Sequence, residues 1–186
     1  ELNISANIKL QKLYVDNNKL AALNVQKNVE LTELHCVDNK IEAINVSNNE
    51  ELEYLYCGNN QIDTIDVSNN IVLRDFYCSN NQIKFLEGLH NLSLSSLDCS
   101  YNQLKELDVS EQYYLNTLNC RNNQLQELII GEQKIVNINC SKNALEKLDI
   151  EHMTYFNELR CDGNLFDCEK LKSKFKIDGE GSMWEK

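Results

Sequence analysis

The sequence predicts an α/β-type solenoid dominated by β-structure, in which short coils stack into a curved rod. Cysteine recurs with a period of 21 residues, asparagine follows it at a fixed offset, and apolar residues flank both. One such repeat cannot bury its apolar side alone, so neighbouring coils must share one core. We expect a parallel β-sheet on the concave face, irregular or short extended segments on the convex face, and a short C-terminal capping helix.

The cysteines define the phase of the repeat. They are spaced by 21 residues, with a single step of 20, and Val15 occupies the same phase one repeat before the first of them. The cysteines in phase are Cys36, Cys57, Cys78, Cys99, Cys120, Cys140 and Cys161. Asparagine stands three residues after each of the eight positions, as Asn18, Asn39, Asn60, Asn81, Asn102, Asn123, Asn143 and Asn164. The unit L-x-x-L-x-C-x-x-N-x-L in eight copies predicts a repeat array.

This phase divides the chain into an array and a cap. Residues 1–166 form the array, with a half repeat at 2–9 and eight repeats that start at residues 10, 31, 52, 73, 94, 115, 135 and 156. Residues 167–186 are expected to form a C-terminal cap and tail. Asp167 is placed to cap the N-terminus of a short helix that buries Leu171 and Phe175 against the last coil.

The segment Leu31-Thr-Glu-Leu34-His-Cys36-Val-Asp-Asn39-Lys-Ile41 resembles the conserved part of a leucine-rich repeat. The period of 21, the cysteine and a second half of the form L-D-V-S resemble a nested bacterial type, internalin-like in general architecture. The resemblance implies a bacterial cell-surface or secreted protein with a role in adhesion or host interaction. A scaffold that serves many binding tasks says little about the partner.

The repeat cysteines are interpreted as an inward ladder. Residues two apart on a strand point the same way, so Leu34 and Cys36 face the core while Glu33 and His35 face outward. A small buried thiol fits parallel side chains better than a bridge does, so free thiols are favoured over occasional disulfides and over a metal site. Cys168 lies outside the phase, and we expect it to be buried under the cap.

The repeat asparagines are interpreted as structural. Each side chain can donate to and accept from backbone groups that a sharp turn leaves unpaired. Cysteine and asparagine together therefore form a structural ladder along the predicted rod.

Composition excludes several functions. The net charge of -11 argues against nucleic acid as a partner, and no apolar run is long enough to insert into a membrane. No G-x-S-x-G, H-E-x-x-H or P-loop motif is present, so we expect no enzyme, no cofactor and no metal. The sequence makes no prediction of the oligomeric state.

Outward strand positions supply the candidate ligand-binding residues. Aromatic side chains gather toward the N-terminal end of the predicted concave face, and basic ones follow toward the C-terminal end. The candidates are Tyr14, His35, Tyr54, Tyr56, Tyr77, Tyr101, Arg121 and Arg160. Tyrosine is enriched in binding hot spots, but it is also favoured in β-sheets for its own sake.

These observations predict a non-enzymatic recognition domain that binds a protein, or alternatively a glycan, on its concave face. Two other functions stay open. The array could be a structural spacer or stalk that displays other modules, or the regulatory repeat array of a larger intracellular protein.

Overall fold

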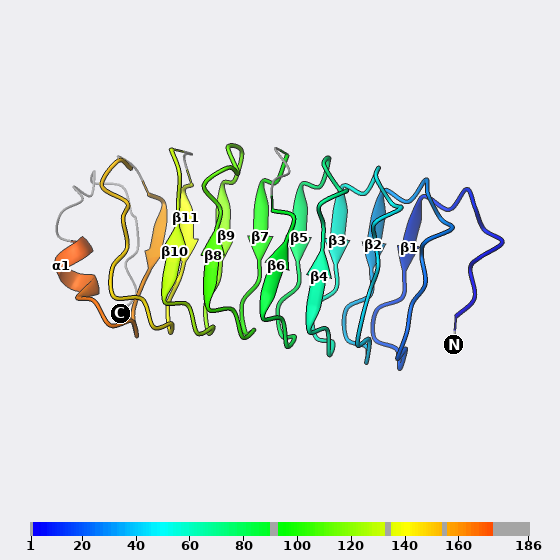
Figure 1. The fold of residues 1–186 in the computed structure, drawn as a ribbon, viewed down its shortest axis with the longest axis horizontal. Coiled ribbons are helices and arrows are strands. Elements are labelled where there is room, and N and C mark those ends of the chain that lie inside the picture. Colours follow the sequence, from blue (N-terminus) through cyan, green and yellow to red (C-terminus); the bar gives the residue numbers. More distant parts are fainter. Residues whose placement is uncertain (1, 90–92, 133–134, 154–155, 173–186) are drawn as a thin grey trace.

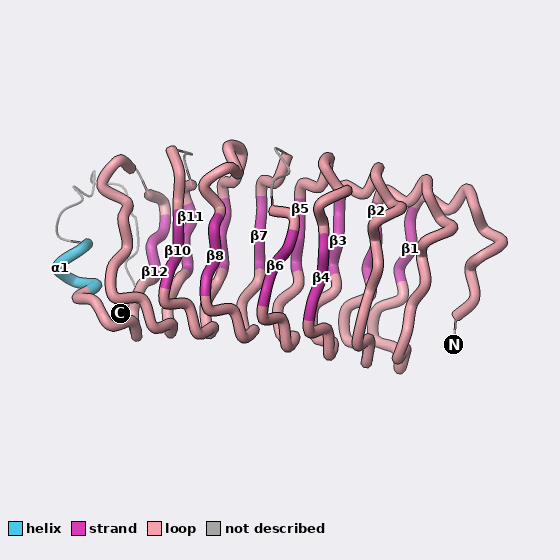
Figure 2. The backbone as a smooth tube through the Cα atoms, in the orientation of Figure 1, coloured by secondary structure: helices cyan, strands magenta, loops and turns pink. Residues whose placement is uncertain are grey.

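The computed structural model describes residues 2–89, 93–132, 135–153 and 156–172. These residues form a stack of coils with β1 near one end of the long axis and a short helix, α1, at the other (Figure 1). Each strand is three residues long and joined by turns, so loops outweigh regular structure in every coil (Figure 2). The predicted β-dominated solenoid is confirmed.

One strand of each coil contributes to an eight-stranded parallel sheet, in the order β1-β2-β3-β5-β7-β9-β11-β12. The sheet occupies the face that the sequence predicts to be concave, and we call it the eight-stranded face. Its strands are Lys12–Tyr14, Glu33–His35, Tyr54–Tyr56, Asp75–Tyr77, Ser96–Asp98, Thr117–Asn119, Asn137–Asn139 and Glu158–Arg160. Neighbouring strands pair residue by residue without a shift, as in Leu34 opposite Leu55. The 21-residue period dictates this register, because equal coils place equal positions side by side.

The opposite face carries two separate two-stranded sheets. β4 (Thr64–Asp66) pairs with β6 (Phe85–Glu87), and β8 (Glu106–Asp108) pairs with β10 (Glu127–Ile129). The prediction of short extended segments on this face is therefore confirmed.

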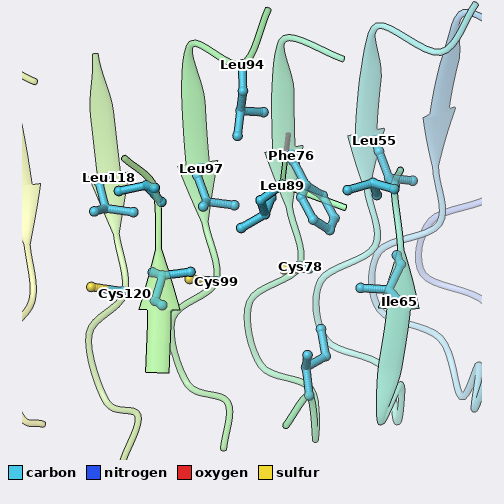
Figure 3. Close-up of a cluster of buried hydrophobic side chains, with 14 of the residues drawn as sticks. Leu55, Ile65, Phe76, Cys78, Leu89, Leu94, Leu97, Cys99, Leu118 and Cys120 are labelled. Atoms are coloured by element: carbon cyan, nitrogen blue, oxygen red, sulfur yellow. The ribbon is translucent and has the colours of Figure 1, made fainter. Parts of the chain in front are cut away.

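The core lies between the two faces. The central residue of every strand on the eight-stranded face is buried, and its two neighbours point outward. Figure 3 shows Leu55, Phe76, Leu97 and Leu118 in one row across the stack, with Leu89 next to Phe76 and with Ile65 and the cysteines below that row. Because each coil adds the same apolar set, the core runs continuously through the stack.

A side-chain amide closes the turn after each repeat cysteine, and we call this row of asparagines the cysteine-side ladder. Asn102 donates from Nδ2 to the carbonyls of Cys78 and Cys99, at 3.0 Å each, while its Oδ1 accepts the N–H of Ile83 at 3.0 Å. The same pattern recurs at Asn39, Asn60, Asn81, Asn123, Asn143 and Asn164. Asn18, in the first coil, donates only to its own coil, at Val15 and Asp16.

The residue before each of these asparagines adopts a left-handed backbone conformation. The φ angles lie between 53° and 69°, at Asn17, Asp38, Asn59, Asn80, Tyr101, Asn122, Lys142 and Gly163. Asparagine, aspartate and glycine tolerate this conformation best, which explains why Asn-Asn pairs are so common in the chain.

A second row of buried amides closes the other turn, and we call it the valine-side ladder because it follows buried valines such as Val46. Its members are Asn28, Asn49, Asn70 and Gln112, each with no exposed surface. Asn49 donates from Nδ2 to the carbonyls of Val25 and Asn28, at 3.2 and 2.7 Å. In the repeats that carry these four amides, the two halves therefore use the same kind of side chain to stabilise their turns.

All seven cysteines in phase are buried, but they are not all free thiols. Cys36, Cys57, Cys78, Cys99, Cys120 and Cys140 are free, and burial raises the pKa of their thiols, to about 12 for Cys36 and for Cys140. Cys161 instead forms a disulfide with Cys168. The expectation of a free thiol at Cys161 was wrong, because the cap brings an out-of-phase cysteine back over the last coil, where the Cα atoms lie 5.8 Å apart.

The cap begins as predicted. α1 spans Cys168–Lys172, and the N–H of Lys170 donates to Oδ1 of Asp167 at 3.0 Å, so Asp167 caps the helix. Leu171 packs against the core while partly exposed. The predicted burial of Phe175 and the tail up to residue 186 lie outside the described residues.

Candidate binding face

Four aromatic rings form a column on the outward side of the eight-stranded face, and we call it the aromatic column. It consists of Tyr14, His35, Tyr56 and Tyr77, which are in register on β1, β2, β3 and β5. The ring centroids are 4.7, 4.3 and 5.0 Å apart in that order, and the last pair meets edge to face. These separations lie at or near the range in which aromatic pairs attract each other beyond simple burial.

Acidic side chains contact the rings of the aromatic column. They stand at the other outward position of the strands, two residues before the aromatic position. Glu33 receives an ion pair from Lys12 at 2.8 Å and contacts Nε2 of His35 at 2.9 Å, while Tyr56 donates its hydroxyl to Asp75 at 3.2 Å. The hydrogen bond from Lys12 is the main cause that lowers the pKa of Glu33, so this carboxylate stays ionised. Burial first, and then Asp75, raises the pKa of the Tyr56 phenol, so it remains a neutral donor.

The remaining candidates lie apart from the aromatic column. Tyr54 is on β3, but it lies in the neighbouring outward column, which also contains Glu33 and Asp75. Tyr101 is on the turn after β7, and the guanidinium carbon of Arg121 lies 5.9 Å from its ring centroid. Arg160 lies on β12 at the far edge of the sheet, where it pairs with Glu158. The structure therefore brings together four of the eight candidates, and places the other four around the same face.

Comparison with known proteins places this geometry in a family. The family model described as Leucine Rich repeats (2 copies) matches residues 29–70. The functional domain of InlJ from Listeria monocytogenes, which includes a cysteine ladder, superposes with a TM-score of 0.85 at 37% identity over 89% of this chain and 37% of that chain. The chain is a leucine-rich repeat protein. Its architecture is internalin-like, with a ladder of cysteines.

More distant structures share the fold alone. A leucine-rich repeat protein of Leptospira interrogans has a TM-score of 0.69 at 23% identity, over 87% of this chain and 51% of that chain. YopM, a leucine-rich effector protein from Yersinia pestis, has a TM-score of 0.73 at 22% identity, over 88% and 52%. A comparison with curated protein sequences found no match. This leucine-rich repeat chain covers about a third to a half of the length of these three matched chains.

The C-terminal half of the eight-stranded face in this leucine-rich repeat array is polar. Asn119 donates from Nδ2 to Oδ2 of Asp98 at 3.1 Å, and Asp98 accepts from both the N–H and the hydroxyl of Ser100. Tyr77 joins the two halves through a hydrogen bond of 3.0 Å between its hydroxyl and that of Ser96. The face thus changes from aromatic to amide and acid between β5 and β7.

The sequence placed acids such as Glu33 on this face, but the candidate binding residues did not include the acids that hold the aromatic column. Asp16 accepts the N–H of Val37 at 2.7 Å and its other oxygen lies 3.8 Å from Nδ1 of His35. Glu33 and Asp75 are also contacts of the rings, as described above. The signal was present in the period, since each acid stands two residues from an aromatic position in its own or an adjacent repeat.

The described residues contain no cluster of three or more His, Cys, Asp or Glu side chains able to hold a metal ion. None of the helical segments among them is long and apolar enough to cross a membrane.

Proposed function

We propose that the chain is a non-enzymatic recognition domain of a bacterial cell-surface or secreted protein, and that it binds a protein ligand on its eight-stranded face. The contact surface consists of the aromatic column with Tyr54, Tyr101, Arg121 and Arg160 around it. The observation that carries the proposal is the aromatic column itself, in which Tyr14 is 56% exposed. A glycan is the alternative ligand class.

The aromatic column is suited to rigid docking. Its rings are held by one another and by Glu33 and Asp75, so little side-chain entropy is lost when a partner binds. Tyrosine offers a large apolar area and one hydroxyl with few rotors, which is why it is common in binding surfaces.

The backbone at Tyr101 gives independent support. Most equivalent positions carry Asn, Asp or Gly, which tolerate the left-handed region, whereas Tyr101 holds φ 54° with a bulky side chain. A strained residue that the fold does not require supports a role in binding. Its ring is exposed and carries the guanidinium of Arg121 over it.

The cell-surface or secreted location rests on similarity to an internalin domain and on the bacterial type of the repeat. A leucine-rich repeat scaffold typically supplies a preformed binding surface and no catalytic groups. Two other functions compete with recognition, namely a structural spacer and the regulatory array of a larger intracellular protein.

The test compares two pairs of tyrosines. A tagged chain first captures a partner from surface and secreted protein fractions, and the Kd of that pair is measured by calorimetry. We expect Tyr56→Ser with Tyr77→Ser to raise the Kd at least tenfold, because both rings leave the contact surface. The matched control is Tyr113→Ser with Tyr114→Ser, which removes two exposed rings from the turn before β9.

The binding result decides between recognition and the spacer function. Circular dichroism and urea unfolding establish that both double variants are folded. If the aromatic-column variant loses stability but binds as tightly as the wild type, the rings serve the sheet alone and the spacer function is favoured.

A further inference from the structure

The face opposite the eight-stranded sheet is interrupted at its middle. β6 and β8 come from adjacent coils but belong to different two-stranded sheets. Figure 1 shows them farther apart than β4 is from β6 or β8 from β10. The facing edges of β6 and β8 therefore have no strand ladder between them, although every adjacent pair on the eight-stranded face has one.

Gly88 explains the interruption. It occupies the position that Val67 and Val109 hold in the neighbouring coils, and its φ is 77°. A Cβ built there would lie 2.2 Å from the backbone N of Ser68, so only glycine permits this approach. The coil packs tightly against the coil before it, and this leaves space on the side of the coil after it.

A groove of about 400 Å³ opens at this break, and we call it the inter-sheet groove. Leu86, Leu89 and Leu107 supply its apolar floor, and Phe85, which is 57% exposed, and Ile129 stand at its sides. An apolar groove beside unpaired strand edges suits an extended peptide, which adds main-chain hydrogen bonds and places alternate side chains in the groove.

The charges around the inter-sheet groove are of one sign. Glu106, Asp108, Glu111 and Glu127 line it, and its described lining residues include no lysine or arginine. Glu106 and Glu127 are moreover direct register partners on β8 and β10, an arrangement in which like charges repel. A cationic side chain between them would relieve that repulsion.

We propose that the inter-sheet groove binds an extended segment of a partner protein in which basic side chains alternate with apolar ones. The segment pairs its main chain with the edge of β6 or β8, places its apolar side chains on Leu86, Leu89 and Leu107, and directs its basic ones to Glu106 and Glu127. This site lies on the face opposite the aromatic column, so the proposal can be tested independently of the proposed function.

The probe is a fluorescent seven-residue peptide of alternating lysine and valine, titrated with the full chain and read by anisotropy. We expect Glu106→Gln with Glu127→Gln to weaken binding at least tenfold. The matched control, Glu42→Gln with Glu146→Gln, removes two exposed carboxylates outside the groove and should leave the Kd within twofold. Phe85→Ser provides a second groove variant if the first fails to fold.

Two further peptides separate strand pairing from plain charge attraction. A peptide with N-methylated backbone amides keeps its charge but loses its donors, and we expect at least tenfold weaker binding. A glutamate–valine peptide should not bind. Equal binding of the methylated and unmethylated peptides, or no binding of the lysine–valine peptide, would overturn the proposal. A wild-type chain that dimerises in sedimentation, when the groove variants do not, would assign the groove to a second copy instead.

Discussion

Side-chain amides close both turns in the coils that carry the two ladders, but the two ladders satisfy those amides differently. In the cysteine-side ladder, Asn102 uses its donors and its acceptor, so the amide is paired at both ends. In the valine-side ladder, Asn49 pairs through its donors, while its Oδ1 is buried without a hydrogen-bond partner. Asn28 and Gln112 show the same one-sided pattern.

This difference indicates that the turn on the cysteine side is more strictly required by the fold than the turn on the valine side. Asparagine occupies the cysteine-side position in all eight coils, and in seven of them it uses both its donor and its acceptor. Another side chain there would leave a backbone N–H of the preceding coil without its acceptor. The one-sided ladder accepts Gln112, and the segments beside it accept Gly88 and a broken sheet. Among the described residues, the departures from asparagine in the turn-closing position therefore fall on the valine side.

The largest expected effect acts on the cysteine side alone, through the thiols. Burial raises the pKa of all six free thiols, to about 12 for Cys36 and for Cys140, against about 8.5 in an unfolded chain. Stability from this source is fully present below the unfolded pKa and is lost as the pH rises above it, because only the unfolded chain ionises its thiols. At pH 10 we expect a loss of about 2 kcal/mol per thiol, and the losses of the six thiols add to the largest effect, measured by urea unfolding between pH 7 and 10.

Cys99→Val is the control for the thiol effect, since valine occupies the equivalent place at Val15. This variant should fold, and its stability should fall less steeply with pH than that of the wild type. An unchanged slope would mean that Cys99 ionises in the folded chain.

The next largest effect comes from breaking the fully paired ladder. Asn102→Ala removes a side chain that joins two coils. It leaves the N–H of Ile83 without its acceptor and takes one of the two amide donors from each of the carbonyls of Cys78 and Cys99. We expect a loss of about 3 kcal/mol in the free energy of unfolding, measured in urea. The outward Asn119→Ala loses a hydrogen bond to Asp98 and a longer one from the N–H of Arg121, both partly exposed to water, and it should lose less than about 1 kcal/mol.

The sequence predicted most reliably the parts of the fold that recur. The phase of Leu34 and Cys36 and the inward row of asparagines follow from period and alternation, which eight copies make unambiguous, whereas the cap at Asp167 was predicted from its local capping residue. The disulfide from Cys161 to Cys168 was missed because the second cysteine lies outside the period.

The candidate site was predictable in part for the same reason. Tyr14, His35, Tyr56 and Tyr77 share a strand position, so their alignment follows from the register. The irregularity at Gly88 was visible, but the groove was not, because it depends on how closely one coil approaches Ser68 in the coil before it. That distance is set by packing in three dimensions and has no counterpart in the repeat pattern.

A substitution in the one-sided ladder tests the comparison directly. Asn49→Ala removes donors to Val25 and Asn28, but it also removes a buried oxygen that has no partner. Relief of that unpaired oxygen offsets part of the cost, so we expect a loss of about 1.5 kcal/mol, roughly half that at Asn102. Measured under the same urea conditions, a loss equal to or larger than that of Asn102→Ala would contradict the distinction between the two ladders.

The smallest effect is a gain in stability at the cost of the binding surface. Tyr101→Asn places a residue that tolerates φ 54° where the ladder holds tyrosine, and equivalent positions already carry asparagine. We expect the free energy of unfolding to rise by about 0.5 kcal/mol. The loss of the contact between the Tyr101 ring and Arg121 reduces this gain. The matched change at Lys142, Lys142→Asn, relieves the same backbone strain at another turn of the cysteine side. If both variants are more stable and Tyr101→Asn alone binds the partner more weakly, Tyr101 serves recognition at the expense of the turn. If Tyr101→Asn is less stable than the wild type, the ring of Tyr101 supports the fold.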